Sequence, residues 1–249
     1  ICGVIGETRG ELAESRLRSM LAAIVHRGPD DEGVLHKPGA ALGMRRLSII
    51  DLAGGHQPVF NEDGTVGIVF NGEIYNFAQL WSTLENSGHR FRTRSDTEVI
   101  VHAYEEWGEA CVKHLRGMFA FAVWDGRAGH HDARVFLARD RLGIKPLYYA
   151  IVDGTLLFAS EVRALLASGA VARRLARESV EAYLLFGSVV EPMTMVQGVF
   201  SLPPGHSLMV SCREASKCKP AAYWDLATAA NELRESSLPK TIPEAARAV

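Results

Sequence analysis

The sequence predicts a sheet-rich α+β sandwich, in which helices precede and separate several strands. Two observations lead to this fold class. Strand-like apolar runs and apolar residues at helical spacing follow one another without the regular strand–helix–strand repeat of a parallel sheet. The chain also contains no Gly-x-Gly-x-x-Gly segment and no P-loop, so dinucleotide binding and P-loop phosphate binding lack their signatures.

The first part of the chain predicts a buried strand, a helix and two further strands. Residues 1–6 are apolar or glycine and predict a short buried strand. A helix follows, since four apolar residues recur at helical spacing: Leu17, Met20, Leu21 and Ile24. The Gly28-Pro29 pair ends that helix in a turn. The next strands are expected at residues 42–50 and 66–70, with the Asp63-Gly64 turn between them.

The middle of the chain predicts two helices, a group of strands and a last helix. Apolar residues at positions 77, 80 and 84 line the first helix, and Ser95-Asp96-Thr97-Glu98 fits a capping box that begins the second. Strands are expected at residues 118–124, 135–139 and 147–152, with an Asp153-Gly154 hairpin signal leading into residues 156–159. The last helix is expected near residues 178–186.

The composition is that of an ordinary globular protein with one large or two small domains. Of the 249 residues, 47% are hydrophobic and 22% are charged, and the net charge is −2. This charge gives no general electrostatic affinity for nucleic acid. No apolar run approaches the ~20 residues of a membrane span, and no basic start with an apolar segment marks a secretory signal. We therefore expect neither a nucleic-acid nor a membrane partner.

The cysteines indicate the compartment. The chain has four of them, Cys2, Cys111, Cys212 and Cys218, and none lies in a CxxC pair, so zinc-binding and thioredoxin-like motifs find no support. A reducing cytoplasm is the simplest location for such a chain.

The character of the sequence changes at about residue 206. Residues 1–205 contain the strand and helix patterns described above and are expected to form one domain. Beyond Trp224 the chain is Ala-rich and polar, and Pro239 and Pro243 interrupt it. We interpret residues 206–249 as a connector toward a further domain.

Cys2 stands next to the written start of the chain and is followed by Gly3. A cysteine thiol is a strong nucleophile, and an α-amine, whose pKa is about 7.7–8.0, can accept its proton at neutral pH. One residue at a chain terminus can therefore supply both nucleophile and base. Taken alone, Cys2 is more simply a small buried residue in the starting strand. As the sequence is written, the free amine belongs to Ile1.

Cys2 is also the first of several unusual segments. They are residues 2–6 (CGVIG), 26–30 (HRGPD), 46–51 (RLSIID), 57–58 (QP), 71–76 (NGEIYN), 95–98 (SDTE), 117–121 (GMFAF), 139–149 (RDRLGIKPLYY) and 158–161 (FASE). In this order they closely resemble the N-terminal glutaminase domain of glutamine-hydrolysing asparagine synthetase, a class II glutamine amidotransferase with an N-terminal nucleophile. The resemblance runs from Cys2 to about Gly205, and residues 223–226 (YWDL) are similar to that family's exit toward its second domain.

The resemblance implies an αββα sandwich of two mainly antiparallel sheets, the Ntn-hydrolase type, with the nucleophile at the start of an inner strand. It also implies cleavage of glutamine to glutamate and ammonia. Cys2 would attack the side-chain amide carbon and form a γ-glutamyl thioester, with its own α-amine, once exposed, as the proton shuttle. Asn71 and Gly72 would form the oxyanion hole. The alternative for the Asn-Gly dipeptide alone is a hairpin turn.

Three further residues are expected to bind the substrate. Arg46 would hold the α-carboxylate of glutamine, and strand alternation puts Arg45 on the opposite face. The alternative interpretation of Arg46 is a solvated arginine on a strand. Asp96 would accept the α-ammonium group, although an acidic residue also suits the first turn of a helix. Glu73 is either an additional contact to the ligand or a surface charge.

The remaining motifs are expected to support the structure. Residues 27–30 predict a rigid turn near the site, and Arg139-Asp140-Arg141 predicts charge pairs in a scaffold. His130-His131-Asp132 contains metal-ligand residue types but lies in a polar, glycine-flanked loop. We therefore expect no metal site and no cofactor in this chain.

The sequence departs from the resemblance in two places. Ile1 stands where the family has a removable initiator Met, and its retention would place the amine one residue away from the thiol. The Ser-Gly-Gly-x-Asp-Ser phosphate loop of an ATP-pyrophosphatase domain is absent. We therefore expect a missing synthetase domain, in cis or in trans, that binds ATP and Mg²⁺ and amidates aspartate to asparagine.

Two alternatives stay open. One is a non-catalytic scaffold domain, as in the β-lactam synthetases and lasso-peptide cyclases that resemble this family. The other is a glutaminase that serves a different carboxylate acceptor. The joint presence of Cys2, Arg46, Asn71, Gly72 and Asp96 favours an active glutaminase. The sequence is compatible with a homodimer and does not specify the oligomeric state.

Overall fold

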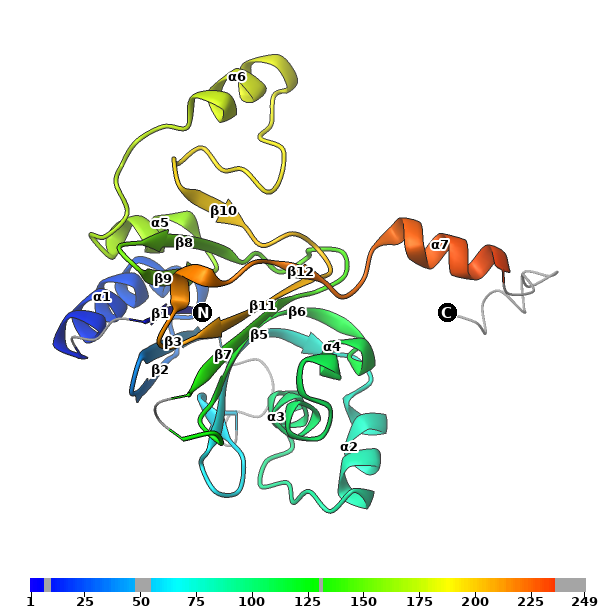
Figure 1. Cartoon of the computed structure of the whole chain (residues 1–249). Coiled ribbons are helices and arrows are strands. Elements are labelled where there is room, and N and C mark those ends of the chain that lie inside the picture. Colours follow the sequence, from blue (N-terminus) through cyan, green and yellow to red (C-terminus); the bar gives the residue numbers. More distant parts are fainter. Residues whose placement is uncertain (7–9, 48–54, 130–131, 236–249) are drawn as a thin grey trace.

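A computed structural model of the chain describes residues 1–6, 10–47, 55–129 and 132–235 (Figure 1). The helices are α1 (Gly10–Ala23), α2 (Phe77–Asn86), α3 (Asp96–Trp107), α4 (Cys111–His114), α5 (Val162–Ala167), α6 (Arg177–Phe186) and α7 (Leu226–Glu235). The strands are β1 (Cys2–Ile5), β2 (Asp31–Lys37), β3 (Ala40–Arg46), β4 (Val59–Phe60), β5 (Val66–Ile74), β6 (Gly117–Asp125), β7 (Arg134–Arg139), β8 (Tyr148–Val152), β9 (Thr155–Ala159), β10 (Val199–Ser201), β11 (His206–Ser211) and β12 (Ala221–Ala222).

Two six-stranded sheets lie face to face, and helices cover both outer faces. The first sheet has the strand order β10-β8-β9-β1-β3-β2 and the second β12-β11-β7-β6-β5-β4. All the paired strands run antiparallel. Helices α1 and α5 pack on the first sheet, and α2, α3 and α4 lie on the side of the second (Figure 1). The structure is therefore an αββα sandwich, and the predicted fold class is confirmed.

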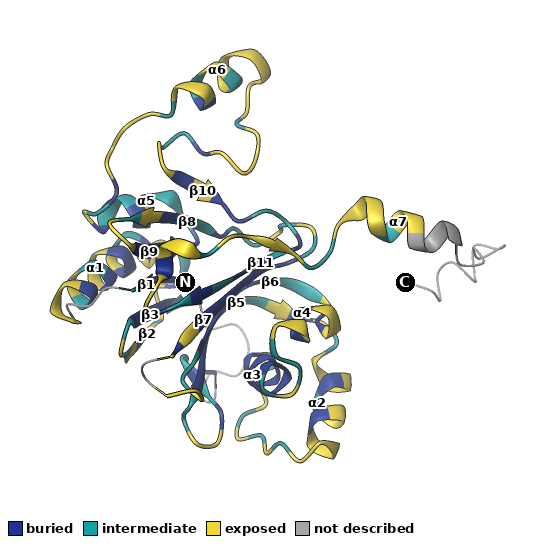
Figure 2. Ribbon diagram, in the orientation of Figure 1, coloured by how far each residue is buried: buried dark blue, intermediate teal, exposed yellow. Residues whose placement is uncertain are grey.

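The core consists of three buried apolar layers (Figure 2). One lies between the sheets and includes Leu42 and Phe158. The second lies between the second sheet and α2–α4 and includes Phe70 and Phe121, and the third lies beneath α1 and α5 and includes Leu17 and Leu157. Because successive side chains of a strand point to opposite faces, each inner strand contributes to two of these layers. Only side chains that point into the first of these layers can reach the space between the sheets.

The Arg139-Asp140 segment anchors the loop after β7 and joins it to β6. Asp140 accepts hydrogen bonds from four backbone N–H groups, those of Phe119, Leu142, Ile144 and Lys145. Arg139 donates to three backbone carbonyls, those of Gly143, Lys145 and Leu202. Buried backbone groups need such partners. The predicted scaffold role is confirmed, although these charges bind the backbone and not each other.

The periodic segments of the sequence match the longer elements, while several short elements were not predicted. The sequence pattern predicts none of β2, α5, β10, β11 and β12. In β2 only Leu35 is fully buried, so an edge strand of this kind shows no apolar alternation. Helix α5 has six residues, which is too short for a clear helical period. Strand β3 ends at Arg46, and residues 48–50 of the predicted strand lie outside the described residues.

The second sheet continues past the domain boundary predicted at residue 205. Strand β11 pairs with β7 and β12, and its Leu208 and Val210 are buried between the sheets. The Tyr223 hydroxyl donates a hydrogen bond of 2.7 Å to the Arg139 carbonyl oxygen. Residues 206–224 therefore belong to the sandwich, and the connector predicted from residue 206 begins later. The change in composition at 206 reflects an edge of the sheet and not the end of the domain.

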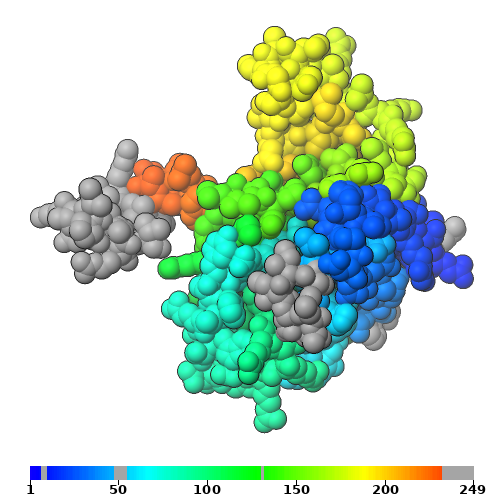
Figure 3. All heavy atoms as spheres, turned by 180° about the vertical axis from the view of Figure 1, so that it is seen from behind, coloured from blue at the N-terminus to red at the C-terminus, as the bar shows by residue number. Residues whose placement is uncertain are grey.

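Helices α6 and α7 stand apart from the sandwich. Figure 3 shows the α6 region, in yellow and yellow-green, projecting from the body, and α7, in orange, leading away on another side. Three consecutive apolar residues of α6 are exposed to solvent: Leu184 by 78%, Leu185 by 76% and Phe186 by 71%. None of the helices in the described ranges has the length and apolarity needed to cross a membrane. Pro239 and Pro243 lie outside those ranges.

Candidate active site

All six predicted site residues lie at one end of the sandwich, five of them on β1, β3 and β5 and the sixth, Asp96, at the start of α3. Lys37 is the last residue of β2, and its Nζ lies 4.8 Å from the ring centroid of Trp124. Trp124 is on β6, opposite the start of β5. The turn between β2 and β3 therefore lies at the end of the sandwich where β5 begins. The opposite end of the sandwich therefore brings together the end of β3, with Arg46, and the end of β5, with Asn71–Ile74. The first residue of β1, Cys2, lies at this same end because β1 runs antiparallel to β3.

Asn71 and Gly72 lie within a strand. In β5, Asn71 pairs with Ala120 and Gly72 with Phe119 of β6, so the hairpin-turn interpretation of this dipeptide is excluded. Glycine is required here by contact, since a Cβ atom on Gly72 would collide with the Met118 carbonyl oxygen and lie 2.8 Å from Phe119 Cα. The absence of a side chain lets β5 and β6 approach closely beside Asn71.

The Gly72 N–H points to an open edge of β5. Tyr75 N donates to the Arg116 carbonyl, and because hydrogen-bonded pairs alternate along an antiparallel ladder, the N–H groups of Phe70, Gly72 and Ile74 point away from β6. The outer two have side-chain acceptors: Phe70 N donates to Gln57 Oε1 at 2.7 Å and Ile74 N to Asp96 Oδ2 at 2.9 Å. Gly72 N, between them, has no acceptor in the described part of the chain.

The Asn71 side chain supplies a second donor without a partner. Val69 belongs to the layer between the sheets, so alternation places Asn71 and Glu73 on the same face of β5. Asn71 Nδ2 is buried and makes no hydrogen bond within the described residues. A buried donor without an acceptor is costly, and such groups in native structures call for an explanation such as a ligand. Asn71 Nδ2 and Gly72 N together form a pair of donors suited to a ligand oxygen.

Arg46 and Arg45 occupy opposite faces of β3, as predicted. Arg45 Nε donates to the Leu21 carbonyl of α1 at 3.3 Å, and its guanidinium forms an ion pair with Glu32 at 2.5 Å. Arg46 shares its face with Leu42 and Met44, which lie between the sheets, and is only 8% exposed. It is therefore a buried arginine at the end of the sandwich, and the alternative of a solvated strand residue is wrong.

The HRGPD segment forms the expected tight turn against β3. A Cβ atom on Gly28 would collide with the backbone of Arg45 and with Arg46 N, so only glycine fits at this position. Asp30 N also donates to the Arg46 carbonyl at 3.2 Å. The turn thus fixes the backbone that carries Arg46.

Asp96 begins α3 and is tied to the end of β5. Besides accepting from Ile74 N, it lies near Glu73, and the pKa of its carboxyl is raised, mainly by burial and further by the charge of Glu73. Glu73 itself is exposed. Two carboxylates therefore face the same end of the sandwich, where a positively charged group would offset their repulsion.

The capping box at the start of α3 is formed only in part. Ser95 Oγ accepts from Thr97 N at 3.0 Å, as expected of an N-cap residue. Glu98 does not return to Ser95 N. It accepts instead from Arg92 N at 2.8 Å and Thr93 N at 2.6 Å, and so holds the segment that precedes the helix.

The structure places the Cys2 thiol on the other face of the first sheet. Cys2 pairs with Gly43, where a Cβ atom would lie 2.9 Å from Leu21 Cδ1 of α1, and Cys2 packs in the layer beneath α1 and α5. It is fully buried, and this burial raises the pKa of its thiol to about 12. The thiol is therefore not directed toward Arg46 or Asn71, although the resemblance implies that Cys2 attacks a substrate held by these residues.

Ile1, and not Cys2, extends into the layer between the sheets. Its side chain is 3% exposed, its nitrogen donates to Ser160 Oγ at 3.0 Å, and its carbonyl accepts from Ser160 N at 2.9 Å. Beside it, Arg27 Nη1 donates to Glu161 Oε1 at 3.1 Å. The sequence interpretation assigned no role to Ser160 and Glu161. The FASE segment was the available signal, and the structure shows that its Ser160 holds Ile1.

Two predicted segments cannot be placed. Ser48, Ile49, Ile50 and Asp51 of the RLSIID segment lie outside the described residues. His130 and His131, for which the sequence predicts no metal site, also lie outside the described residues.

The αββα sandwich places the chain in the fold class of the Ntn-type amidotransferases. Among solved structures, the chain is similar to a glutamine phosphoribosylpyrophosphate amidotransferase from B. subtilis, with a TM-score of 0.65 and 18% identity, over 90% of this chain and 49% of that one. At this identity the likeness concerns the fold alone.

The chain belongs to the glutamine amidotransferase domain family, whose model matches residues 1–224. It is 40% identical to asparagine synthetase [glutamine-hydrolyzing] 1 of Bacillus subtilis (strain 168), over 84% of this chain and 33% of that protein. It is 37% identical to amidase chyE of Penicillium rubens, over 84% of this chain and 30% of that protein. The chain spans about a third of the length of these relatives, and it corresponds to the N-terminal glutaminase domain of the synthetases. It is an enzyme domain of the amidotransferase type.

Replacing Asp96 with asparagine is expected to raise the KM for glutamine by about 10-fold or more, because a charge-assisted hydrogen bond to the α-ammonium group is lost. Stability at pH 7 should stay within about 1 kcal/mol, because relief of a buried charge is offset by loss of a favourable helix-dipole interaction. The raised pKa of the Asp96 carboxyl determines how the stability difference between the two proteins changes with pH. The ionised carboxyl is unfavourable above its folded-state pKa, and this cost disappears as the pH falls through that value.

Urea unfolding of both proteins at several pH values, together with glutaminase kinetics, checks this prediction. The stability difference should move in favour of the wild type on acidification. An Asp96→Asn protein with unchanged KM would exclude Asp96 from substrate binding.

Proposed function

We propose that this domain hydrolyses glutamine to glutamate and ammonia through a thioester on Cys2. The observation that carries the proposal is the buried Asn71 Nδ2, which has no partner among the described residues and lies beside the free N–H of Gly72. Two preorganised donors at one point are what a tetrahedral oxyanion requires. Arg46, Glu73 and Asp96 lie at the same end of the sandwich.

The groups around these donors match the two ends of an α-amino acid. Arg46 presents a guanidinium that can pair with the α-carboxylate, and Asp96 with Glu73 can receive the α-ammonium group. The side-chain amide then points at Asn71 and Gly72. Cys2 Sγ attacks the amide carbon, the C–N bond breaks, and ammonia leaves with a proton delivered by the Cys2 α-amine. Water then cleaves the thioester, which yields glutamate and restores the thiol.

The thiol has to turn toward Asn71 for this reaction, and the Cys2 amine has to be free. Removal of residue 1 frees the Cys2 amine and also removes the hydrogen bonds to Ser160 that hold the start of β1. For the thiol to turn, Cys2 must in addition leave its pairing with Gly43 and Ala159. Because the mechanism requires removal of residue 1, the identity of the N-terminal residue is the first thing to measure.

A non-catalytic scaffold is the second candidate. The fully buried thiol, with its raised pKa, on the α1 side of the sheet favours it. Intact mass and N-terminal sequencing of the purified chain, followed by treatment with 6-diazo-5-oxo-norleucine, separate the two functions. A chain that begins at Cys2, releases glutamate from glutamine and is labelled on Cys2 supports the glutaminase. A chain that begins at Cys2 and shows neither activity nor labelling is a scaffold.

The ammonia is proposed to serve an ATP- and Mg²⁺-dependent synthetase domain that amidates aspartate to asparagine. The similarity to an asparagine synthetase supports this acceptor, and the similarity to an amidase supports a different one. We place the protein in the cytoplasm, where a reducing environment suits its four cysteines, all of them free thiols in the structure.

The exposed apolar residues of α6 are proposed as the docking surface for that synthetase domain. Tyr183, Leu184, Leu185 and Phe186 form an uninterrupted apolar stretch that the sandwich leaves uncovered. Contiguous apolar surface of this kind marks interaction sites. The lengths of the relatives indicate what would bind this surface. In them the matching region makes up only 33% or 30% of the chain and is joined to a much larger remainder.

Leu185→Glu and Phe186→Glu should weaken association with a separately produced synthetase domain of the same family by about tenfold or more, since each removes about 1.5–3 kcal/mol of apolar burial. Isothermal titration calorimetry measures the association. The melting temperature of the isolated chain should not change, because these side chains touch little of their own domain. Leu12→Glu, on the exposed side of α1, is the matched control. Unchanged association, or a large loss of stability, would contradict this docking surface.

A further inference from the structure

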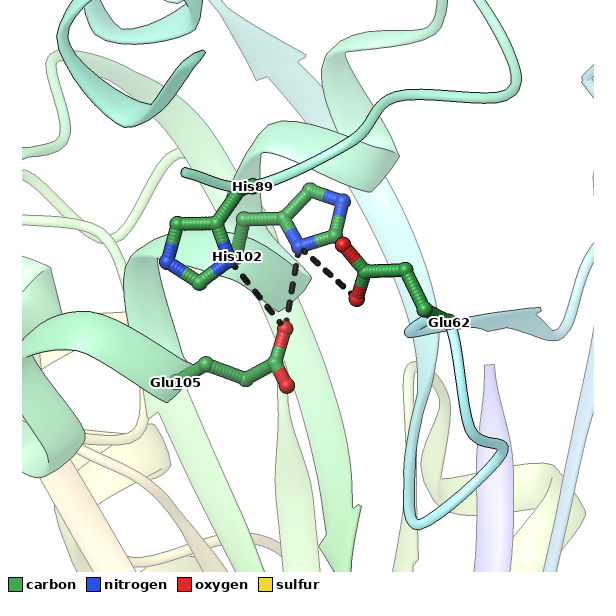
Figure 4. Close-up of side chains that lie close together, drawn as sticks. All are labelled: Glu62, His89, His102 and Glu105. Atoms are coloured by element: carbon green, nitrogen blue, oxygen red, sulfur yellow. Dashed lines mark hydrogen bonds and ion pairs between the residues drawn. The ribbon is translucent and has the colours of Figure 1, made fainter. Parts of the chain in front are cut away.

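We propose that Glu62, His89, His102 and Glu105 form a binding site for a divalent transition-metal ion of the zinc class. One ligand atom from each residue lies within 4.8 Å of all the others (Figure 4). His102 Nδ1 is 2.9 Å from Glu105 Oε2 and 3.9 Å from Glu62 Oε2, and His89 Nδ1 is 3.7 Å from Glu105 Oε2. The cluster lies apart from Arg46 and Asn71 and takes no part in the proposed glutaminase reaction.

The four residues come from three separate segments. Glu62 lies between β4 and β5, His89 follows α2, and His102 and Glu105 are three positions apart on α3. Residues three apart on a helix share a face, so α3 contributes a preformed pair. No sequence motif indicates this site, because its members span more than 40 positions of the chain. The packing of the β4–β5 connection and the segment after α2 against α3 creates it.

The surrounding contacts orient the ligands. His102 is fully buried, and the edge of the neighbouring Phe91 ring packs on it with centroids 4.6 Å apart. Asn61 Nδ2 donates to Glu105 Oε1 at 2.6 Å and so leaves Oε2 directed at His102. Outer hydrogen bonds of this kind fix metal-binding carboxylates and imidazoles in known sites. A surface cluster formed by chance would lack such support.

The donor set determines the metal. Two imidazole nitrogens and two carboxylate oxygens suit Zn²⁺ in tetrahedral geometry, with bonds of about 2.0–2.2 Å, and Co²⁺ in the same geometry. Mg²⁺ prefers six oxygen ligands and does not suit this site. An ion placed among the four atoms replaces the proton shared by His102 and Glu105 and draws in His89 and Glu62, of which Glu62 is the most accessible member of the cluster.

Zinc and cobalt titrations of the purified chain test the site. We expect one Zn²⁺ per chain by calorimetry, and a rise in melting temperature on the order of 5 °C at saturating metal. Tetrahedral Co²⁺ should give visible d–d absorption without a thiolate charge-transfer band, which distinguishes this site from binding at the cysteines. His89→Gln and Glu62→Gln should each weaken Zn²⁺ binding by about tenfold or more.

The controls keep the proposal falsifiable. His36→Gln, at an exposed histidine on β2, should leave Zn²⁺ affinity unchanged. His102→Gln should abolish binding, but because it alters a buried residue, the judgement rests on the two more accessible variants. Absence of a Zn²⁺-dependent melting shift, a cobalt spectrum with thiolate absorption, or equal affinity in His89→Gln and His36→Gln would each overturn the metal site. MgCl₂ serves as the negative control.

Discussion

Replacing Cys2 with alanine is expected to reduce glutamate release from glutamine by about 10⁴-fold or more. Loss of a covalent nucleophile removes the whole acyl-transfer route, and the residual rate then reflects binding and the oxyanion donors alone. Because Cys2 is fully buried in a well-packed layer, the same change should also lower stability by about 1 kcal/mol. Glutamate release measured on protein proven to begin at residue 2 is the decisive assay.

Cys218→Ala is the matched control for this prediction. Cys218 is another free thiol, half-buried in the structure, and its substitution should leave activity unchanged. A Cys2→Ala protein that still hydrolyses glutamine at a similar rate would remove Cys2 from the mechanism. The donors at Asn71 and Gly72 would then need another explanation.

Replacing Asn71 with alanine is expected to lower kcat by about 10²–10³-fold with little change in KM. The amide NH₂ acts only when negative charge develops on the substrate oxygen, so its removal affects the transition state more than the bound substrate. The stability should not fall, and this is unusual for an asparagine whose amide nitrogen is buried. Asn71 Nδ2 bonds to nothing in the described structure, so the substitution strands no partner from that atom.

Asn61→Ala provides the contrast. Its side chain accepts from Val66 N at 3.0 Å and donates to Glu105 Oε1 at 2.6 Å, so its loss leaves buried groups unsatisfied and should cost about 1–3 kcal/mol while kcat remains intact. Urea unfolding and steady-state kinetics on both variants form the measurement. An Asn71→Ala protein that loses stability but keeps its kcat would show that Asn71 is structural.

Much of the candidate site was predictable from residue types and local spacing. Alternation in β3 correctly separated Arg45 from Arg46, because successive side chains on a strand point to opposite faces. The position of Asp96 at the start of α3 followed from Ser95 as N-cap. Alternation alone does not predict the face of Cys2. That face depends on the pairing of Cys2 with Gly43, which is about 40 positions away in the sequence.

The fold was predictable where a segment is long and periodic. Helices α1, α2 and α3 and strands β5 and β6 carry a clear apolar period, and the sequence predicted all of them. Strand β11 failed this test, and the domain boundary was placed too early as a result. Its Leu208 and Val210 are buried because β7 and β12 hold β11 in the sheet, and these long-range pairings are not visible in local spacing.

The sequence by itself determined the family, since the ordered segments from Cys2 to Glu161 resemble a glutaminase domain and predict its nucleophile, donors and charged groups. Only the tertiary structure decided which of these groups meet. It left Asn71 Nδ2 without a partner among the described residues, turned the Cys2 thiol to the α1 side, and gathered Glu62, His89, His102 and Glu105. The physical reason is that local spacing sets the face of an element on which a side chain lies. Strand register and the packing of layers decide what that face meets.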